Sequence, residues 1–191
     1  DATGNPVERG AGELTLDVPS PGMPLGFWGE PGRYEQTYWS RWPGRWHHGD
    51  WVERTMAGSW FVHGRSDDTL KIAGKRLGPA EVENVANLVP GVLESVAIGV
   101  ADPIKGSAIV IFVRVADPAF AGELCDLVTE NVMTQLGRPL RPAQVLAVAD
   151  LPRTRSGKLL RRLVHDVHVG RDVDPGQPSL ANPDSLMALR G

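Results

Sequence analysis

Residues 64–90 read GRSDDTLKIAGKRLGPAEVENVANLVP, and this stretch decides the fold of the chain. Leu70–Ile72 alternates as a short strand, and Gly74 follows where a tight turn is expected, so the pattern predicts a hairpin. Pro79 then occupies a first helical position, with acidic residues nearby and valines spaced along one apolar face. The stretch therefore predicts a hairpin followed by a helix, which Pro90 and the next glycine end.

After this stretch, runs of β-branched residues alternate with a long helical period. Residues 92–100 and 108–115 are runs of strand length, and residues 145–148 supply another strand. Residues 119–136 have helical periodicity that ends at Gly137. The order β, α, β, β, α, β predicts an α/β (α+β) unit, in which helices pack on a small three-stranded sheet with the hairpin at its amino-terminal side.

The segment before residue 64 differs in composition. Residues 1–63 carry all six tryptophans, many glycines and prolines, and short alternating runs such as residues 13–18. These features are typical of brief strands joined by tight turns, and they predict a β-rich remnant of a larger domain. Because the tryptophans have few aliphatic neighbours, we expect some of the rings to face protein outside this chain.

Composition excludes several classes of protein. A net charge of −3 and a pI near 6.0 give no global attraction to nucleic acid or to an anionic membrane. No apolar run approaches the ~18 residues that span a bilayer, and residues 1–10 lack a signal pattern. The single cysteine, Cys125, is predicted to be a small core residue and fits a cytoplasmic location. The chain starts without methionine, so we expect a fragment.

A second motif, PRTRSGK at residues 152–158, is basic and flexible. Ser156 and Gly157 lead to Lys158, and no acidic residue occurs between positions 151 and 165. One interpretation of such a lysine is a solvated basic loop that precedes a helix beginning near residue 159.

Together these motifs resemble the carboxyl-terminal region of AMP-forming acyl-CoA synthetases. The resemblance rests on residues 64–90, 96–115 and the run PRTRSGKLLRR, and it covers most of residues 26–188. Residues 33–38, Gly49-Asp50 and the tail at 179–183 are similar to the short-chain, acetyl-CoA synthetase-like branch. The resemblance implies three segments. They are 1–66, the β-rich end of the large AMP-binding domain; 67–170, a mobile carboxyl-terminal domain; and 171–191, an extended tail.

The resemblance also implies an acid–thiol ligase reaction. The family joins a carboxylate to the α-phosphate of ATP, expels pyrophosphate, and passes the acyl group from AMP to coenzyme A. Both reactants of the first step are anionic, so an ammonium group between them offsets their repulsion. Lys158 matches the family's catalytic lysine. The implied cofactors are ATP or AMP, coenzyme A and, with the large domain, Mg²⁺.

Three further residues match nucleotide-binding positions of the family. Asp50 matches the aspartate that accepts hydrogen bonds from the ribose hydroxyls, although a turn-forming Gly-Asp is the alternative. Arg65 matches an arginine that contacts ribose or phosphate, and its alternative is a surface ion pair with Asp67 or Asp68. Arg76 matches an arginine that positions the ligand and its loop.

The remaining matches concern motion and coenzyme A. Asp67 matches the hinge residue, although an aspartate in a turn needs no such role. Ala73 and Gly74 match the loop that approaches the pantetheine tunnel, and Gly74 alternatively supplies a positive φ in a hairpin turn. His47 and His48 lack a third ligand at metal-binding spacing, so we expect them to face solvent and predict no metal site.

The phosphate-gripping loop and the adenine and acyl pockets belong to the family's amino-terminal AMP-binding domain, which we do not find here. The sequence therefore predicts part of a short-chain, acetate-like synthetase that is inactive alone, with the missing domain, a small carboxylic acid and coenzyme A as partners. Two alternatives remain: the end of another adenylate-forming enzyme, or a regulatory module whose Lys158 is the target of a lysine acetyltransferase and deacetylase. Nucleic-acid binding by residues 153–162 is disfavoured by the acidic balance and the lack of aromatic residues there.

Overall fold

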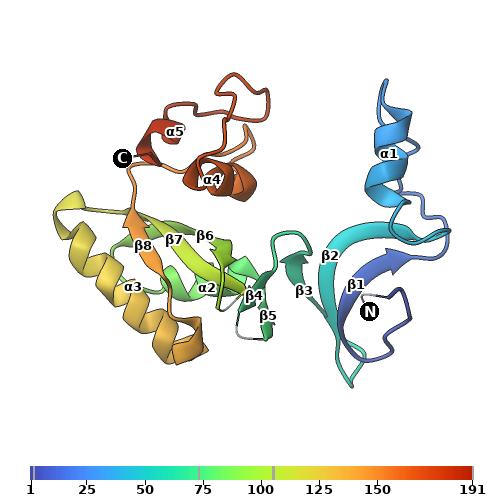
Figure 1. The fold of residues 1–191 in the computed structure, drawn as a ribbon, viewed down its shortest axis with the longest axis horizontal. Coiled ribbons are helices and arrows are strands. Elements are labelled where there is room, and N and C mark those ends of the chain that lie inside the picture. The colour runs from blue at the N-terminus through green and yellow to red at the C-terminus, as the bar shows by residue number, and fades with distance from the viewer. Residues whose placement is uncertain (2, 73, 105, 191) are drawn as a thin grey trace. The chain divides into compact units, whose positions relative to one another are not determined.

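The computed structural model describes residues 1, 3–72, 74–104 and 106–190. The chain forms two compact units, Asp1–Asp67 and Asp68–Gly191, and each has its own sheet (Figure 1). The mixed α/β class that the sequence predicts is confirmed. Within the described ranges, no helix is both long and apolar enough to cross a membrane.

The first unit is built on a three-stranded antiparallel sheet with β2 in the middle. Its order is β1-β2-β3, and its elements are β1 (Gly10–Leu16), α1 (Pro31–Tyr38), β2 (Trp46–Arg54) and β3 (Trp60–Arg65). The ring of Tyr38 on α1 stacks on Trp46 of β2, with 4.7 Å between the ring centroids. Trp46 is buried, whereas Trp28 and Trp60 are exposed. The tryptophans of this segment therefore do not form one core.

The second unit is built on a five-stranded sheet. Its order is β5-β4-β7-β6, with β8 pairing parallel to β7. Its elements are β4 (Leu70–Ile72), β5 (Lys75–Leu77), α2 (Pro79–Ala86), β6 (Val92–Asp102), β7 (Gly106–Val115), α3 (Ala121–Leu136), β8 (Gln144–Ala147), α4 (Arg161–His168) and α5 (Ser185–Ala188), with short 3₁₀ turns at Pro118–Phe120 and Arg138–Leu140. The predicted hairpin and three-stranded sheet are joined, because Ile72 of β4 pairs with Gly106 of β7.

Both faces of the second sheet are buried. Side chains alternate along β7, so Ile109, Ile111 and Val113 pack with α2 and α3, whereas Val110 and Phe112 pack with α4 and the carboxyl-terminal segment. Figure 1 shows α3 on one side of this sheet and α4 with α5, in red, on the other. This double burial explains why the central parts of the two strands, residues 96–100 of β6 and 108–113 of β7, are continuous apolar runs that do not alternate with polar residues.

Residues 171–190 differ from the expected extended tail. Leu180, Leu186 and Leu189 are buried in the same apolar cluster as α4, and Ser185–Ala188 forms the short helix α5. The segment folds back because these leucines cover the face of the sheet that carries Val110 and Phe112, and burying them removes apolar surface from water. The carboxyl-terminal segment is thus part of the second unit's core.

Candidate active site

Lys158 lies on a tight, hydrogen-bonded turn. Arg153 and Leu159 form an isolated antiparallel bridge, and the Thr154 amide donates to the Lys158 carbonyl at 2.8 Å. Gly157 closes the turn with a φ of 85°, and its amide donates to the Thr154 carbonyl at 2.9 Å. The Lys158 side chain is exposed. The backbone of this loop is therefore fixed, while its ammonium is presented to solvent.

Asn182 of the carboxyl-terminal segment secures the base of this loop. Its amide oxygen accepts from the Arg153 backbone N–H at 2.9 Å, and its Nδ2 donates to Asp150 Oδ2 at 2.6 Å and to the Leu151 carbonyl at 2.9 Å. The Arg153 guanidinium is in turn paired with Glu94 of β6. The loop is thereby tied both to the sheet and to the segment after α4. This role of Asn182 is not predictable from a motif, because nothing local in the sequence links position 182 to position 153.

The β4–β5 hairpin holds Gly74, which is predicted to serve coenzyme A, and Arg76, which is predicted to serve the nucleotide. Gly74 has a φ of 80°, and a Cβ built there would meet no atom within 4 Å. Arg76 is exposed on β5, where it pairs in register with Lys71. Ala73, the third residue predicted in this loop, lies outside the described residues. The positive φ of Gly74 is the conformation that a hairpin turn requires, whatever the loop binds.

In the first unit, Asp50 and Arg65 face each other across neighbouring strands. They are register partners on β2 and β3, and Arg65 Nη1 lies 3.6 Å from Asp50 Oδ1. The same guanidinium donates to the His48 carbonyl at 3.0 Å, and its Nε donates to Asp67 Oδ1 at 3.4 Å. The structure thus brings three predicted residues, Asp50, Arg65 and Asp67, into one cluster. The ion pair that was the alternative interpretation of Arg65 is present.

The backbone at Gly49 makes room for this cluster. Gly49 has a φ of 83°, and a Cβ there would lie 2.5 Å from Nη2 of Arg65. Real Cβ atoms do not approach another atom so closely, so the guanidinium takes the place of a side chain at position 49. The glycine before Asp50 therefore has a packing reason besides its turn geometry.

The two adjacent histidines have separate carboxylate partners. His47 is only 14% exposed, and its Nε2 lies 3.2 Å from Glu13 Oε2 on β1. The expectation that His47 faces solvent is therefore wrong. His48 Nδ1 lies 2.7 Å from Asp50 Oδ2, although the two groups are not aligned for a hydrogen bond. Among the described residues, no group of three His, Cys, Asp or Glu side chains is arranged to hold a metal ion.

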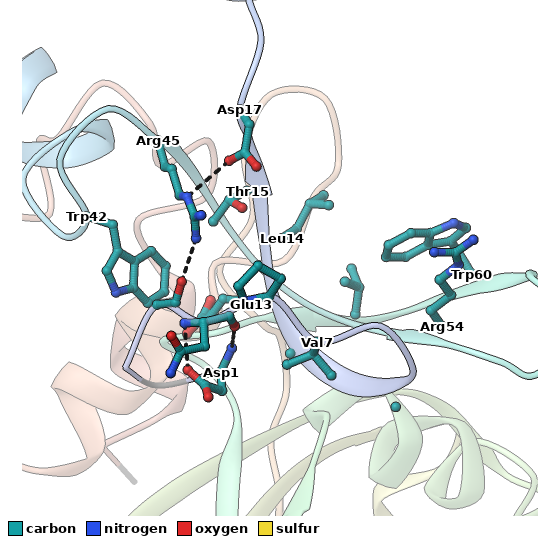
Figure 2. Close-up of a pocket in the computed structure, with 16 residues that line it drawn as sticks. Asp1, Val7, Glu13, Leu14, Thr15, Asp17, Trp42, Arg45, Arg54 and Trp60 are labelled. Carbon is teal, nitrogen blue, oxygen red and sulfur yellow. Dashed lines mark hydrogen bonds and ion pairs between the residues drawn. The ribbon is translucent and has the colours of Figure 1, made fainter.

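A separate cavity of about 170 Å³ lies in the first unit, beside β1 (Figure 2). Arg45 lines it, and its guanidinium is paired with Asp17 at 3.3 Å and hydrogen-bonded to the Gly4 carbonyl. Trp42 and Trp60 are also among the lining residues. Among the described residues that line this cavity, none is a predicted site residue, so the cavity is not the predicted nucleotide site.

Comparison with known proteins agrees with the sequence motifs. Residues 81–158 match the model described as the AMP-binding enzyme C-terminal domain. An acetyl-coenzyme A synthetase of Pyrobaculum aerophilum is 42% identical over 172 residues, which are 89% of this chain and 26% of that protein. Residues 81–158 belong to this domain family. The chain is similar to the carboxyl-terminal region of AMP-forming acyl-CoA synthetases.

Other synthetases match all or nearly all of the chain. An acetoacetyl-coenzyme A synthetase of Rhizobium meliloti is 38% identical over 194 residues, covering 98% of this chain and 29% of that protein. The solved acetoacetyl-CoA synthetase from Streptomyces lividans matches 100% of this chain and 29% of its own, with 32% identity and a TM-score of 0.86. The chain therefore spans less than a third of the length of these synthetases.

Proposed function

We propose that this chain supplies the lysine-bearing, mobile part of a short-chain acyl-CoA synthetase that uses ATP. The observation that carries the proposal is Lys158, an exposed ammonium on a loop whose backbone is hydrogen-bonded at both ends. A rigid loop with a free cationic tip can be delivered to a phosphate without paying for ordering the loop at each turnover. The match of residues 81–158 to the family supports the same assignment.

The reaction proceeds in two steps. First, a carboxylate oxygen attacks the α-phosphorus of ATP and pyrophosphate leaves. Lys158 stabilises the negative charge that gathers between the carboxylate and the phosphate. Second, the thiol of coenzyme A attacks the acyl carbon, and AMP leaves with the former carboxylate oxygen. The charge stabilised by Lys158 belongs to the first step, so we assign the lysine to adenylation.

The Asp50–Arg65 cluster is the proposed nucleotide site. The Asp50 carboxylate has oxygens that can accept both ribose hydroxyls, and its 19% exposure leaves it accessible. The Arg65 side chain is 49% exposed, so its guanidinium can exchange part of its present contacts for ribose or phosphate oxygens. Asp67 contacts the same guanidinium and is the proposed hinge. Arg76 of β5 is the proposed second arginine at the nucleotide.

The β4–β5 hairpin is the proposed approach to coenzyme A. Gly74 leaves open space above the turn, which allows a pantetheine chain to lie against backbone. Ala73 keeps its predicted role as the neighbouring contact. Mg²⁺ would be held with the triphosphate by the large AMP-binding domain, which is the proposed partner. The proposed acyl group is one of the two that the relatives' names give, acetyl or acetoacetyl.

The experiment is a chimera in which this chain replaces the corresponding region of the Streptomyces lividans synthetase, which it matches over 29% of that protein's length. Adenylation is measured as exchange of pyrophosphate into ATP that depends on acetate or acetoacetate. The second step is measured by supplying purified acyl-AMP with coenzyme A. Lys158→Ala should lower exchange by about a hundredfold or more and leave the second step within about threefold.

Arg155→Ala is the matched control, because it removes one positive charge from an exposed position of the same loop. It should change exchange by less than about threefold. A chimera without exchange activity, or equal losses for the two variants, would contradict the proposed role of Lys158.

A second candidate function is regulation by acetylation of Lys158. Its side chain is exposed on a projecting turn, which makes it accessible to a lysine acetyltransferase, and acetylation would remove the ammonium charge. Incubation of the chain with such an enzyme and acetyl-CoA, followed by mass spectrometry, should find modification concentrated at Lys158. Equal modification of Lys71 would count against a specific site.

A further inference from the structure

The guanidinium of Arg161 on α4 contacts both α2 and the segment that precedes β4. Nη2 donates to both carboxylate oxygens of Glu83 on α2 at 2.8 Å, and Nε donates to Glu83 Oε1 at 3.1 Å. Nη1 donates to Asp68 Oδ2 at 3.2 Å. Glu83 also accepts from the Ala97 amide of β6 at 2.9 Å. One arginine thereby links α4, α2 and the first residue of the unit.

Arg161 occupies a position that a helix alone does not favour. It is the first residue of α4, where the partial positive charge of a helix amino terminus repels a cation. The side chain is also 24% exposed, so it has lost much of its hydration. Burial lowers the pKa of the guanidinium, but Glu83 and Asp68 together raise it above its ordinary value. The carboxylates of Glu83 and Asp68 therefore offset two unfavourable effects on Arg161, its position at a helix amino terminus and its loss of hydration.

Asp68 and Arg161 lie close in sequence to the proposed hinge and to the lysine loop, respectively. Asp68 directly follows Asp67, the proposed hinge, and the boundary between the two compact units falls between them. Arg161 comes three residues after Lys158, and the Leu160 amide closes the lysine loop by donating to the Pro152 carbonyl at 2.8 Å. The guanidinium thus connects the residue after the hinge to the end of the lysine loop.

We propose that Arg161 is a positioning residue that couples the Asp67 hinge to the Lys158 loop. By holding Asp68 to Glu83, it keeps residue 68 with the second unit as that unit turns, so the change in backbone angles is confined to residue 67. The lysine loop then follows the hinge as part of one body. This inference rests on the proposed function and adds the element that transmits the rotation.

A partly buried ion pair can also serve the fold alone, so the test must separate motion from stability. Asp68→Asn in the chimera removes one arm of the link and keeps the Arg161–Glu83 pair. If Arg161 transmits rotation, the coupled conversion of acid to acyl-CoA should fall about tenfold. Exchange of pyrophosphate and conversion of supplied acyl-AMP, measured separately, should each stay within about twofold, since neither requires the switch between poses.

Asp172→Asn is the control, because it removes the same charge from an exposed position of the same unit. It should leave the coupled rate within about twofold. Arg161→Lys keeps the charge but loses the planar fork, so its coupled rate should lie between those of Asp68→Asn and the parent.

An unchanged coupled rate in Asp68→Asn would overturn the proposal. Equal losses in the coupled rate and both separate steps, with a lowered melting temperature, would assign Arg161 to the fold alone. Neither result would alter the Lys158→Ala comparison, so failure of the coupling remains distinguishable from failure of the proposed function.

Discussion

The two units differ in where their apolar side chains lie. The second unit buries one cluster on each face of its sheet, with Phe112 1% exposed. In the described part of the first unit, Trp46 and Val52 are the buried hydrophobic residues, whereas Trp28 and Phe61 are 102% and 56% exposed. The second sheet is therefore covered by its own helices, and the first unit leaves large apolar side chains exposed.

This difference suits the roles proposed for the two units. A part that rotates as one body must keep its shape without its neighbour, and two buried clusters give the second unit that independence. The nucleotide cluster of the first unit depends on the β2–β3 pairing of Asp50 with Arg65, which a small core supports. We therefore expect the first unit to unfold more readily than the second.

The largest effect should come from Phe112→Ala. Truncating this fully buried ring should destabilise the second unit by about 3–5 kcal/mol, because it removes apolar contacts and leaves a cavity. Trp60→Ala is the comparison in the first unit, where the ring is 57% exposed. Its cost should be under about 1 kcal/mol. Urea unfolding measures both, with far-ultraviolet circular dichroism following mainly the helices of the second unit.

Tryptophan fluorescence separates the two transitions, because all six tryptophans precede residue 68. Fluorescence should change at lower urea than circular dichroism in the parent, and Phe112→Ala should narrow that gap. Coincident transitions in the parent would show that the two units unfold together and would break the comparison.

Much of the second unit is predictable from sequence because its elements carry local signals. The β-branched runs at 92–100 and 108–115 and the period of residues 119–136 give strands and a helix where the structure has β6, β7 and α3. The packing of residues 171–190 is not predictable in this way. Its leucines are separated by turn-forming residues. They are buried because they pack on the face of the sheet that carries Val110 and Phe112, which no local pattern indicates.

The candidate site likewise has residues that the sequence predicts and contacts that it does not. The resemblance identifies Asp50 and Arg65, and their meeting follows from the β2–β3 register. The supports of the lysine loop are invisible to motif reasoning, because Asn182 lies 29 residues from Arg153 and Arg161 lies 78 residues from Glu83. Such long-range polar contacts depend on the final packing of helices and strands, which no local pattern encodes.

Asn182→Ala should give the next largest effect, about 2–3 kcal/mol in the circular dichroism transition. It removes the acceptor of the Arg153 amide and the donor to Asp150 and Leu151, leaving partly buried groups unpaired. Asn84→Ala, at an exposed position of α2, is the control and should change stability by less than about 0.5 kcal/mol. A similar small change in both variants would show that the tail does not hold the lysine loop.

Gly49→Ala should act on the first unit. The new Cβ would collide with the Arg65 guanidinium, and the positive φ adds backbone strain. Gly58→Ala is a matched control, because it has the same φ of 83° and no atom within 4 Å of its added Cβ. Gly49→Ala should therefore cost about 1–2 kcal/mol more in the fluorescence transition. Equal costs would mean that Arg65 moves away freely and does not need the glycine.

The smallest effect should appear when pH is lowered. Burial acts to raise the pKa of Asp166, but hydrogen bonds from His165 and Arg171 lower it by more than burial raises it. The pKa of Asp166 in the folded state therefore lies below its ordinary value. The carboxylate therefore stabilises the second unit above the unfolded pKa of about 3.9, and this contribution is lost as pH falls through the folded pKa.

Asp166→Asn should reduce the loss of stability between about pH 5 and pH 3 by less than about 1 kcal/mol, because Arg171 is largely exposed. Urea midpoints by circular dichroism across this range measure the effect, and the fluorescence midpoint should show the same pH dependence in parent and variant. A change confined to fluorescence would place the titrating contact in the first unit and contradict the assignment to α4.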